Sequence, residues 1–225
     1  MVRIREHPQI VTPEGARLTI CARGKDDLRR AEARIADLGA QVLALPADVT
    51  EPSAPAELVA ATVERYGGVD ILVANAGGPP AGGSLEVDDD AILAAVNANL
   101  LTSVRLVRQA VPHMRAAGWG RICLITSTTV KEPARSLALS STARTGLWAW
   151  AKTAAADLAP EGITLNLVCP GGHNTDRNRQ LGGTGRRLGD PADFGKVVAF
   201  LCSDVARFVS GTALAIDGAA TAGLL

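Results

Sequence analysis

The feature that most constrains this fold is a regular alternation of short apolar segments with longer amphipathic ones. Each apolar run is rich in Val, Ile and Leu and has the length of a strand, and each intervening segment has the length of a helix. Strands that alternate with helices predict one parallel, doubly wound sheet with right-handed crossovers. The expected strands are 17–23, 41–49, 69–77, 120–127, 163–172 and 212–217, and the expected helices are 25–39, 54–66, 88–117, 142–158 and 190–206.

Composition narrows the class of protein. The chain has 225 residues, 47% of them hydrophobic, which favours a single α/β domain with one core. Lys+Arg and Asp+Glu balance at 23 each, so no charge pattern indicates a nucleic-acid or acidic-membrane partner. We expect a cytoplasmic protein, because no segment resembles a signal peptide or an apolar membrane span.

The four cysteines are widely spaced and mostly lie in apolar runs. Their spacing fits neither a metal site nor a disulfide framework, so we expect buried free thiols and no bound metal. They are Cys21, Cys123, Cys169 and Cys202.

Several short motifs follow the expected strands in a fixed order. They are ADV at 47–49, NAG at 75–77, an asparagine at 99, LITS ending at 127, CPG at 169–171 and VSGTALAIDG at 209–218. In this order and spacing the chain resembles the short-chain dehydrogenases/reductases, from about residue 15 to its end. The resemblance implies an α/β, Rossmann-like, doubly wound parallel sheet in a single domain, 15–225, preceded by an arm, 1–14.

The resemblance also implies a set of residues that would border NADP. Arg23 would meet the 2′-phosphate, although a solvated charge at a strand end is the plainer explanation for it. The other positions would follow the cofactor from the adenine through the ribose to the nicotinamide. In that order they are Asp48, Val49, Asn75, Ala76, Gly77, Pro170 and Gly171.

The N-terminus departs from the family pattern, which begins with a strand, a glycine-rich turn and a phosphate-binding helix. Here QIVT (9–12) resembles the first strand, but only residues 13–16 separate it from the next one. A parallel crossover needs a dozen or more residues. The first β-α unit is therefore truncated, and QIVT would form an antiparallel hairpin, lie across the sheet or pair with another subunit. We expect no NADP(H) binding, or weak binding.

The catalytic set departs as well. Asn99 and Ser127 match two of the family's four catalytic positions, although a helix-internal amide and a structural strand-end hydroxyl are alternative explanations. The family places a tyrosine thirteen residues after the serine and a lysine four residues later, where this chain has Ser140 and Arg144. The only tyrosine, Tyr66, precedes the third expected strand in a position typical of packing.

Two further clusters consist of polar side chains. Ser140, Ser141 and Thr142 stand where a helix is expected to begin, and we interpret them as helix caps placed on the site. His173 and Asp176 form the one close His/Asp pairing. His173 is a candidate replacement acid/base, because its pKa suits neutral pH. The alternative is a histidine on a surface loop.

These observations leave three functions open. The first expectation is a family member repurposed away from hydride transfer, for example a cofactor-independent isomerase, lyase or cyclase acting on a small carbonyl or hydroxyl compound. The alternatives are an NADP-dependent ketone/alcohol oxidoreductase with atypical catalytic residues, and a non-catalytic scaffold or partner subunit. We expect a homodimer or homotetramer built through helices 88–117 and 142–158. Trp148 and Trp150 would lie either in that interface or in the core.

Overall fold

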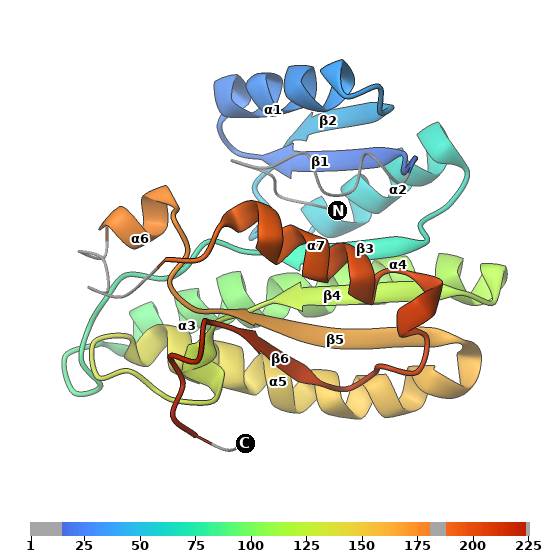
Figure 1. The fold of residues 1–225 in the computed structure, drawn as a ribbon. Coiled ribbons are helices and arrows are strands. Elements are labelled where there is room, and N and C mark those ends of the chain that lie inside the picture. The colour runs from blue at the N-terminus through green and yellow to red at the C-terminus, as the bar shows by residue number, and fades with distance from the viewer. Residues whose placement is uncertain (1–14, 181–187, 224–225) are drawn as a thin grey trace.

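The computed structural model describes residues 15–180 and 188–223, in which helices cover layers of parallel strands (Figure 1). The described strands are β1 (Leu18–Ala22), β2 (Val42–Pro46), β3 (Ile71–Asn75), β4 (Gly120–Ile125), β5 (Ile163–Pro170) and β6 (Ala213–Ile216). The α-helices are α1 (Lys25–Asp37), α2 (Ala54–Tyr66), α3 (Asp89–Val96), α4 (Thr102–Ala117), α5 (Ala138–Leu158), α6 (Asp176–Gln180) and α7 (Pro191–Leu201). Shorter turns are the π-helical η2 (Asn97–Leu101) and the 3₁₀ turns η3 (Thr128–Val130), η4 (Ala159–Glu161) and η5 (Asp204–Ala206).

All strand pairs are parallel, as predicted, but the described strands divide into two sheets. One sheet pairs β1 with β2, and the other has the order β3-β4-β5-β6. A pocket lies between them, lined by Cys21 and Val49 on one side, by Val73 and Asn75 on the other and by Leu106 of α4. Within residues 15–180 and 188–223, no strand is hydrogen-bonded between β1 and β3. The predicted strand remnant QIVT and the arm 1–14 fall outside the described residues.

The larger sheet is buried on both faces, as expected for strands joined by helical crossovers. Alternate residues point to opposite sides, so Leu72 packs with α4 and α5 whereas its neighbour Val73 packs with α7. Figure 1 shows α7 on the opposite face of this sheet from α4 and α5. Trp148 and Trp150 are partly buried against the core on the α5 side, which supports the core-packing alternative for both.

The predicted helix 88–117 forms one helical run with a π turn inside it. Asp88 caps its N-terminus by accepting a hydrogen bond from the Ala91 amide, and η2 separates α3 from α4. Among the described residues, this run is long and apolar enough to cross a membrane by length and composition alone. In the fold, α4 packs against β3 and β4, and α3 packs against α5, as in the core helices of an α/β domain.

Helix α5 begins four residues earlier than predicted, at Ala138 instead of 142. Its N-cap is Leu137, which makes no side-chain capping bond. The hydroxyl cluster therefore lies inside the helix, and the prediction that it caps the helix is wrong. The cause is tertiary: Leu139 packs in a buried cluster with Ala95 of α3, and this contact extends the helix toward its N-terminus. The predicted cap of the last helix is confirmed, because Asp190 accepts from the Ala192 amide.

Candidate functional site

The candidate site lies at the carboxyl ends of β3, β4 and β5. Parallel strands bring these ends to one edge of the sheet, which is where ligands bind in open α/β folds. β3 ends at Asn75, β4 at Ile125 and β5 at Pro170. The residues that follow them include most of the positions predicted from the sequence, and α5 packs alongside β5 and η3.

Arg144 connects two of these strand ends. Its side chain extends from α5, and the residue is 6% exposed. Its guanidinium donates to the Ile125 carbonyl at 3.0 Å and to the Ala76 carbonyl at 3.4 Å. Ser140 lies one helical turn earlier, so it shares this face of α5, and it is also buried. The structure thus brings Ser140 and Arg144 to the edge where the sequence placed them.

Ser127 follows the end of β4 by two residues. It is the N-cap of η3, and its Oγ accepts a hydrogen bond from the Thr129 amide at 3.2 Å. Because η3 packs against α5, Ser127 lies on the segment that faces the first turns of that helix. Ser127 therefore has a capping role just after the end of β4, and its predicted catalytic role stays a prediction.

Asn99 lies in the π turn η2 and is 1% exposed. Its Nδ2 donates to the Ala95 carbonyl at 3.3 Å, whereas its Oδ1 has no hydrogen-bond partner within the described part of the chain. The Oγ of Ser141 is in the same situation. π turns concentrate at functional sites, and orphaned buried acceptors indicate places where water or a ligand group completes the bonding. Gly146 lets α5 approach η2 closely, since a Cβ there would lie 2.9 Å from Leu100.

Sequence reasoning missed the residues that anchor the loop after β2. The Asn97 side chain donates to the Thr50 carbonyl at 3.1 Å, and the Thr102 hydroxyl donates to the Val49 carbonyl at 3.1 Å. Arg105 holds the Asn97 amide in turn, at 2.7 Å. These bonds join the run formed by η2 and α4 to the loop that follows a strand of the smaller sheet. Contacts between segments far apart in the chain leave little local pattern, and the asparagine at the start of the π turn was the only local signal for them.

The loop after β2 also carries the predicted adenosine positions. Asp48 Oδ1 accepts from both the amide and the hydroxyl of Thr50, which shapes the turn. Its other oxygen lies 3.7 Å from the guanidinium of Arg23, whose side chain is 70% exposed. Val49, Asn75 and Ala76 line the pocket between the two sheets.

His173 occupies a different environment from the one predicted. It is 8% exposed, so it is not a surface-loop histidine. Its Nδ1 lies 3.2 Å from the Gly171 carbonyl, and its ring meets Phe194 of α7 edge-on at 5.2 Å. Asp176 is exposed and forms its described ion pair with Arg179. The predicted acid/base role of His173 and Asp176 stays a prediction.

The third segment of the edge is the turn after β5. Gly171 lies so close to Asp217 that a Cβ there would stand 2.8 Å from the Asp217 Cα. The Asp217 carboxylate accepts from the Thr221 hydroxyl at 2.6 Å and the Ala219 amide at 3.0 Å. These bonds, the Thr221 hydroxyl above all, lower the pKa of Asp217. The close packing fixes the backbone where the nicotinamide is predicted to lie.

Tyr66 does not reach the site. It ends α2, and its hydroxyl donates to the Leu18 carbonyl at the opposite, amino end of β1. Burial raises its pKa, and the guanidinium groups of Arg65 and Arg17 lie against its ring. The prediction that Tyr66 is a packing residue agrees with this position.

Two groups of described residues offer contacts that fit NADP(H). Arg23 offers an exposed cation for a 2′-phosphate, and the orphaned Asn99 and Ser141 acceptors lie on the segments beside Arg144. The segment expected to face the diphosphate, 1–14, lies outside the described residues. Among the described residues, no group of three or more His, Cys, Asp and Glu side chains is placed to hold a metal ion.

Comparison with known proteins gives consistent matches. The family model described as enoyl-(acyl carrier protein) reductase matches residues 9–221. An L-rhamnose 1-dehydrogenase (NAD(P)(+)) of Azotobacter vinelandii is 31% identical, over 91% of this chain and 87% of its own length. A Streptomyces coelicolor relative named as a ketoacyl reductase is 38% identical over 160 residues, which are 70% of this chain and 61% of that protein.

A solved structure of an actinorhodin polyketide ketoreductase with NADPH is also similar. It superimposes with a TM-score of 0.86 at 31% identity, covering 92% of this chain and 88% of the ketoreductase.

Proposed function

Because the chain belongs to the short-chain dehydrogenase/reductase family, we propose that it is an NAD(P)-linked oxidoreductase that interconverts a small carbonyl compound and its alcohol. Relatives named as dehydrogenases and reductases support this function over the repurposed enzyme expected from the sequence alone. The observation that carries it is the contact of Arg144 with the Ile125 and Ala76 carbonyls, since Ser140 shares the helix face of Arg144 and Ser127 caps the turn that packs against this helix.

The bound nicotinamide cofactor would supply the hydride. Arg23, whose side chain is exposed, would bind a 2′-phosphate, and the turn at Pro170 and Gly171, where Gly171 packs closely on Asp217, would border the nicotinamide. Ser127 would orient the substrate carbonyl by donating its hydroxyl proton to the oxygen.

Ser140 stands where the family has its proton donor. A serine hydroxyl has a pKa far above the value of about 10 for a phenol, so Ser140 would pass a proton through a hydrogen-bonded water and not ionise itself. The buried guanidinium of Arg144 favours negative charge developing on the substrate oxygen. Arg144 keeps its proton at all relevant pH values, so it acts by charge alone. We expect slow turnover from this arrangement.

A non-redox use of the same cleft is the second candidate. It is favoured by the commitment of Arg144 to the Ile125 and Ala76 carbonyls, which fixes the guanidinium to the protein. A cofactor-independent isomerase, lyase or cyclase would need only the serine hydroxyls and this fixed charge. A non-catalytic scaffold would need neither the serine hydroxyls nor the fixed charge.

Titration with NADPH and NADH, followed by calorimetry, tests the proposal. We expect micromolar NADPH binding, and we expect Arg23→Ala to weaken NADPH more than NADH, which lacks the 2′-phosphate. The double variant S140Y/R144K restores the family's residue types and is expected to raise turnover of a ketone panel at least tenfold. R144K alone is the matched control. No binding of either cofactor, together with no gain in the double variant, would favour the non-redox use or the scaffold.

We also propose a homodimer or homotetramer assembled through α3–α4 and α5. Leu93 and Leu101 of the first helical run are exposed apolar side chains, at 65% and 37%. Light scattering on the purified chain is expected to give twice or four times the monomer mass, and L93E to reduce it. A monomer at micromolar concentration would contradict this assembly.

A further inference from the structure

Two cysteines far apart in the sequence meet in the core, away from the candidate site. Cys123 lies in the middle of β4, and Cys202 is the C-cap of α7. Their sulfur atoms are 3.6 Å apart, although 79 positions separate the residues. Cys123 is 1% exposed and Cys202 is 8% exposed. Cys202 is therefore the more exposed of the two, and we expect a small oxidant to reach it first.

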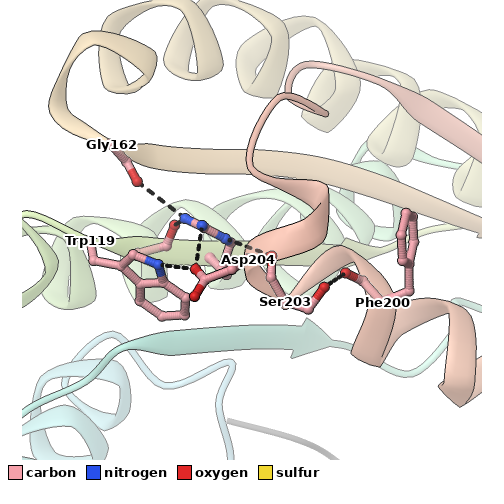
Figure 2. A network of polar contacts seen from close by, with 7 residues as sticks. Trp119, Gly162, Phe200, Ser203 and Asp204 are labelled. Carbon is pink, nitrogen blue, oxygen red and sulfur yellow. Dashed lines mark hydrogen bonds and ion pairs between the residues drawn. The ribbon is translucent and has the colours of Figure 1, made fainter.

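A buried guanidinium lies beside Cys202. Arg121, two residues before Cys123 on the same face of β4, donates from Nε to the Ser203 carbonyl at 3.3 Å. Its Nη2 lies 3.3 Å from Asp204, and its guanidinium stacks on Trp119 at 4.3 Å. Figure 2 shows this network around the residues that directly follow Cys202. The positive charge is held in place by the backbone on both sides of it.

The electrostatics of the two thiols differ. The hydrogen bond between them lowers the pKa of Cys202, burial opposes that shift, and the charge of Arg121 adds to the lowering. The same hydrogen bond and deep burial raise the pKa of Cys123. A thiolate next to an arginine is the environment in which cysteines become nucleophilic.

We propose that Cys202 and Cys123 form a redox modification site that peroxides convert to a disulfide. The Cys202 thiolate attacks one peroxide oxygen, so that a sulfur–oxygen bond forms, the oxygen–oxygen bond breaks and hydroxide leaves. That hydroxide takes up the proton lost by Cys202 and becomes water. Cys123 then attacks the sulfenic sulfur and releases a second water. Two thiols and one peroxide thus give one disulfide and two waters.

The disulfide would tie α7 to the centre of the sheet. Closing the bond requires the sulfur atoms to approach from 3.6 Å to about 2.05 Å, which Cys202 can accommodate because it stands at a helix end. Phe194 of α7 contacts His173, so the cross-link also fixes the helix that supports the loop after β5.

Cys169 is the matched control within the chain. It is fully buried on the opposite face of the sheet from this pair, and its sulfur contacts the Thr126 hydroxyl at 3.2 Å. Burial raises its pKa. Cys169 is therefore a buried thiol on the next strand whose pKa stays raised by burial, although the charges of Lys131 and Arg144 oppose that shift.

The test exposes the folded full-length chain to hydrogen peroxide and then alkylates the remaining thiols for mass spectrometry. We expect wild type and Cys169→Ser to lose two alkylatable thiols and to yield a peptide that links Cys123 to Cys202. Cys202→Ser should lose none. Cys123→Ser should retain a sulfenic acid at Cys202 that dimedone traps. Arg121→Lys should react several-fold more slowly, and its circular dichroism spectrum confirms that it is folded.

Three results would overturn the proposal, and a fourth would remove one part of it. All four thiols staying reduced would exclude the site. Loss of Cys169 at the rate of Cys202 would show that the local environment has no effect. Reaction only in urea would show that the pair is oxidised through the unfolded chain. An unchanged rate in a folded Arg121→Lys variant would remove the role assigned to the guanidinium charge.

Discussion

Two buried arginines mark the opposite ends of β4, and their surroundings differ. At the amino end, Arg121 is 2% exposed and donates to the carbonyls of Gly120, Gly162 and Ser203 while it pairs with Asp204. At the carboxyl end, Arg144 donates to two carbonyls. Near Arg144, buried oxygens of Asn99, Ser141 and Thr129 lack partners among the described residues.

This difference indicates a stabilising role for the amino end of β4 and a ligand-binding role for the carboxyl end. The amino end is closed by a network that connects β4, β5 and η5, which is what a stabilising centre requires. The carboxyl end keeps unpaired hydrogen-bonding capacity on three buried side chains beside a positive charge, whereas at the amino end only the Thr164 hydroxyl, opposite Arg121 in the sheet, lacks a partner among the described residues. An anionic or polar ligand can complete that bonding, so the two ends should respond differently to substitution.

Removal of Arg121 should have the largest effect on stability. Arg121→Met is expected to lower the free energy of unfolding by about 3 kcal/mol, because three carbonyls lose a charged donor. Urea denaturation measures the loss. Asp204→Asn is the matched control, and since that carboxylate is 80% exposed, it should cost less than about 1 kcal/mol. Equal losses in both variants would show that the ion pair and not the backbone bonds holds this end.

Removal of Arg144 should cost less stability but more binding. Arg144→Met is expected to lose about 2 kcal/mol from its two carbonyl bonds and to weaken NADPH binding at least tenfold. Calorimetry and denaturation report the two effects separately. Arg108→Met, on the exposed face of α4, should stay within about 0.5 kcal/mol. An Arg144→Met variant with unchanged NADPH affinity would contradict the division between the two ends.

Two glycines test the same division with smaller changes. A Cβ at Gly120 would lie 2.6 Å from Met114, and one at Gly171 would lie 2.5 Å from Asp217. Both alanine variants should lose about 1.5 kcal/mol through overpacking. Only Gly171→Ala, at the carboxyl end, should also weaken cofactor binding. Equal losses of cofactor affinity in the two alanine variants would indicate that cofactor binding depends on the stability of the fold alone.

Acid should affect the carboxyl end most. The pKa of Asp217 is lowered in the folded protein, so its carboxylate stabilises the fold above its unfolded pKa of about 3.9 and this contribution is lost as the pH falls through the folded value. Stability measured from neutral pH down to about pH 3 should therefore decline more in wild type than in Asp217→Asn. The Arg121 guanidinium keeps its proton throughout. Equal acid profiles would contradict the role of the Thr221 bond.

The sequence by itself determined the order of strands and helices, because hydrophobic periodicity is a local property. The helix expected near 54–66 is confirmed at Ala54–Tyr66, and the Asp190 cap is confirmed by its bond with the Ala192 amide. The family resemblance placed Ser140 and Arg144 on the tyrosine and lysine positions, whereas only the structure, in which α5 begins at Ala138, puts both on one helix face. All four cysteines are buried, as expected.

Only the tertiary structure decided which groups meet. The start of α5 depends on Leu139 packing against α3, and the burial of His173 depends on Phe194. The separation of β1–β2 from the larger sheet and the contact of Cys123 with Cys202 join segments far apart in the chain. Such contacts depend on how finished elements pack, and a local pattern of residue types carries no information on the distance between two sulfurs 79 positions apart.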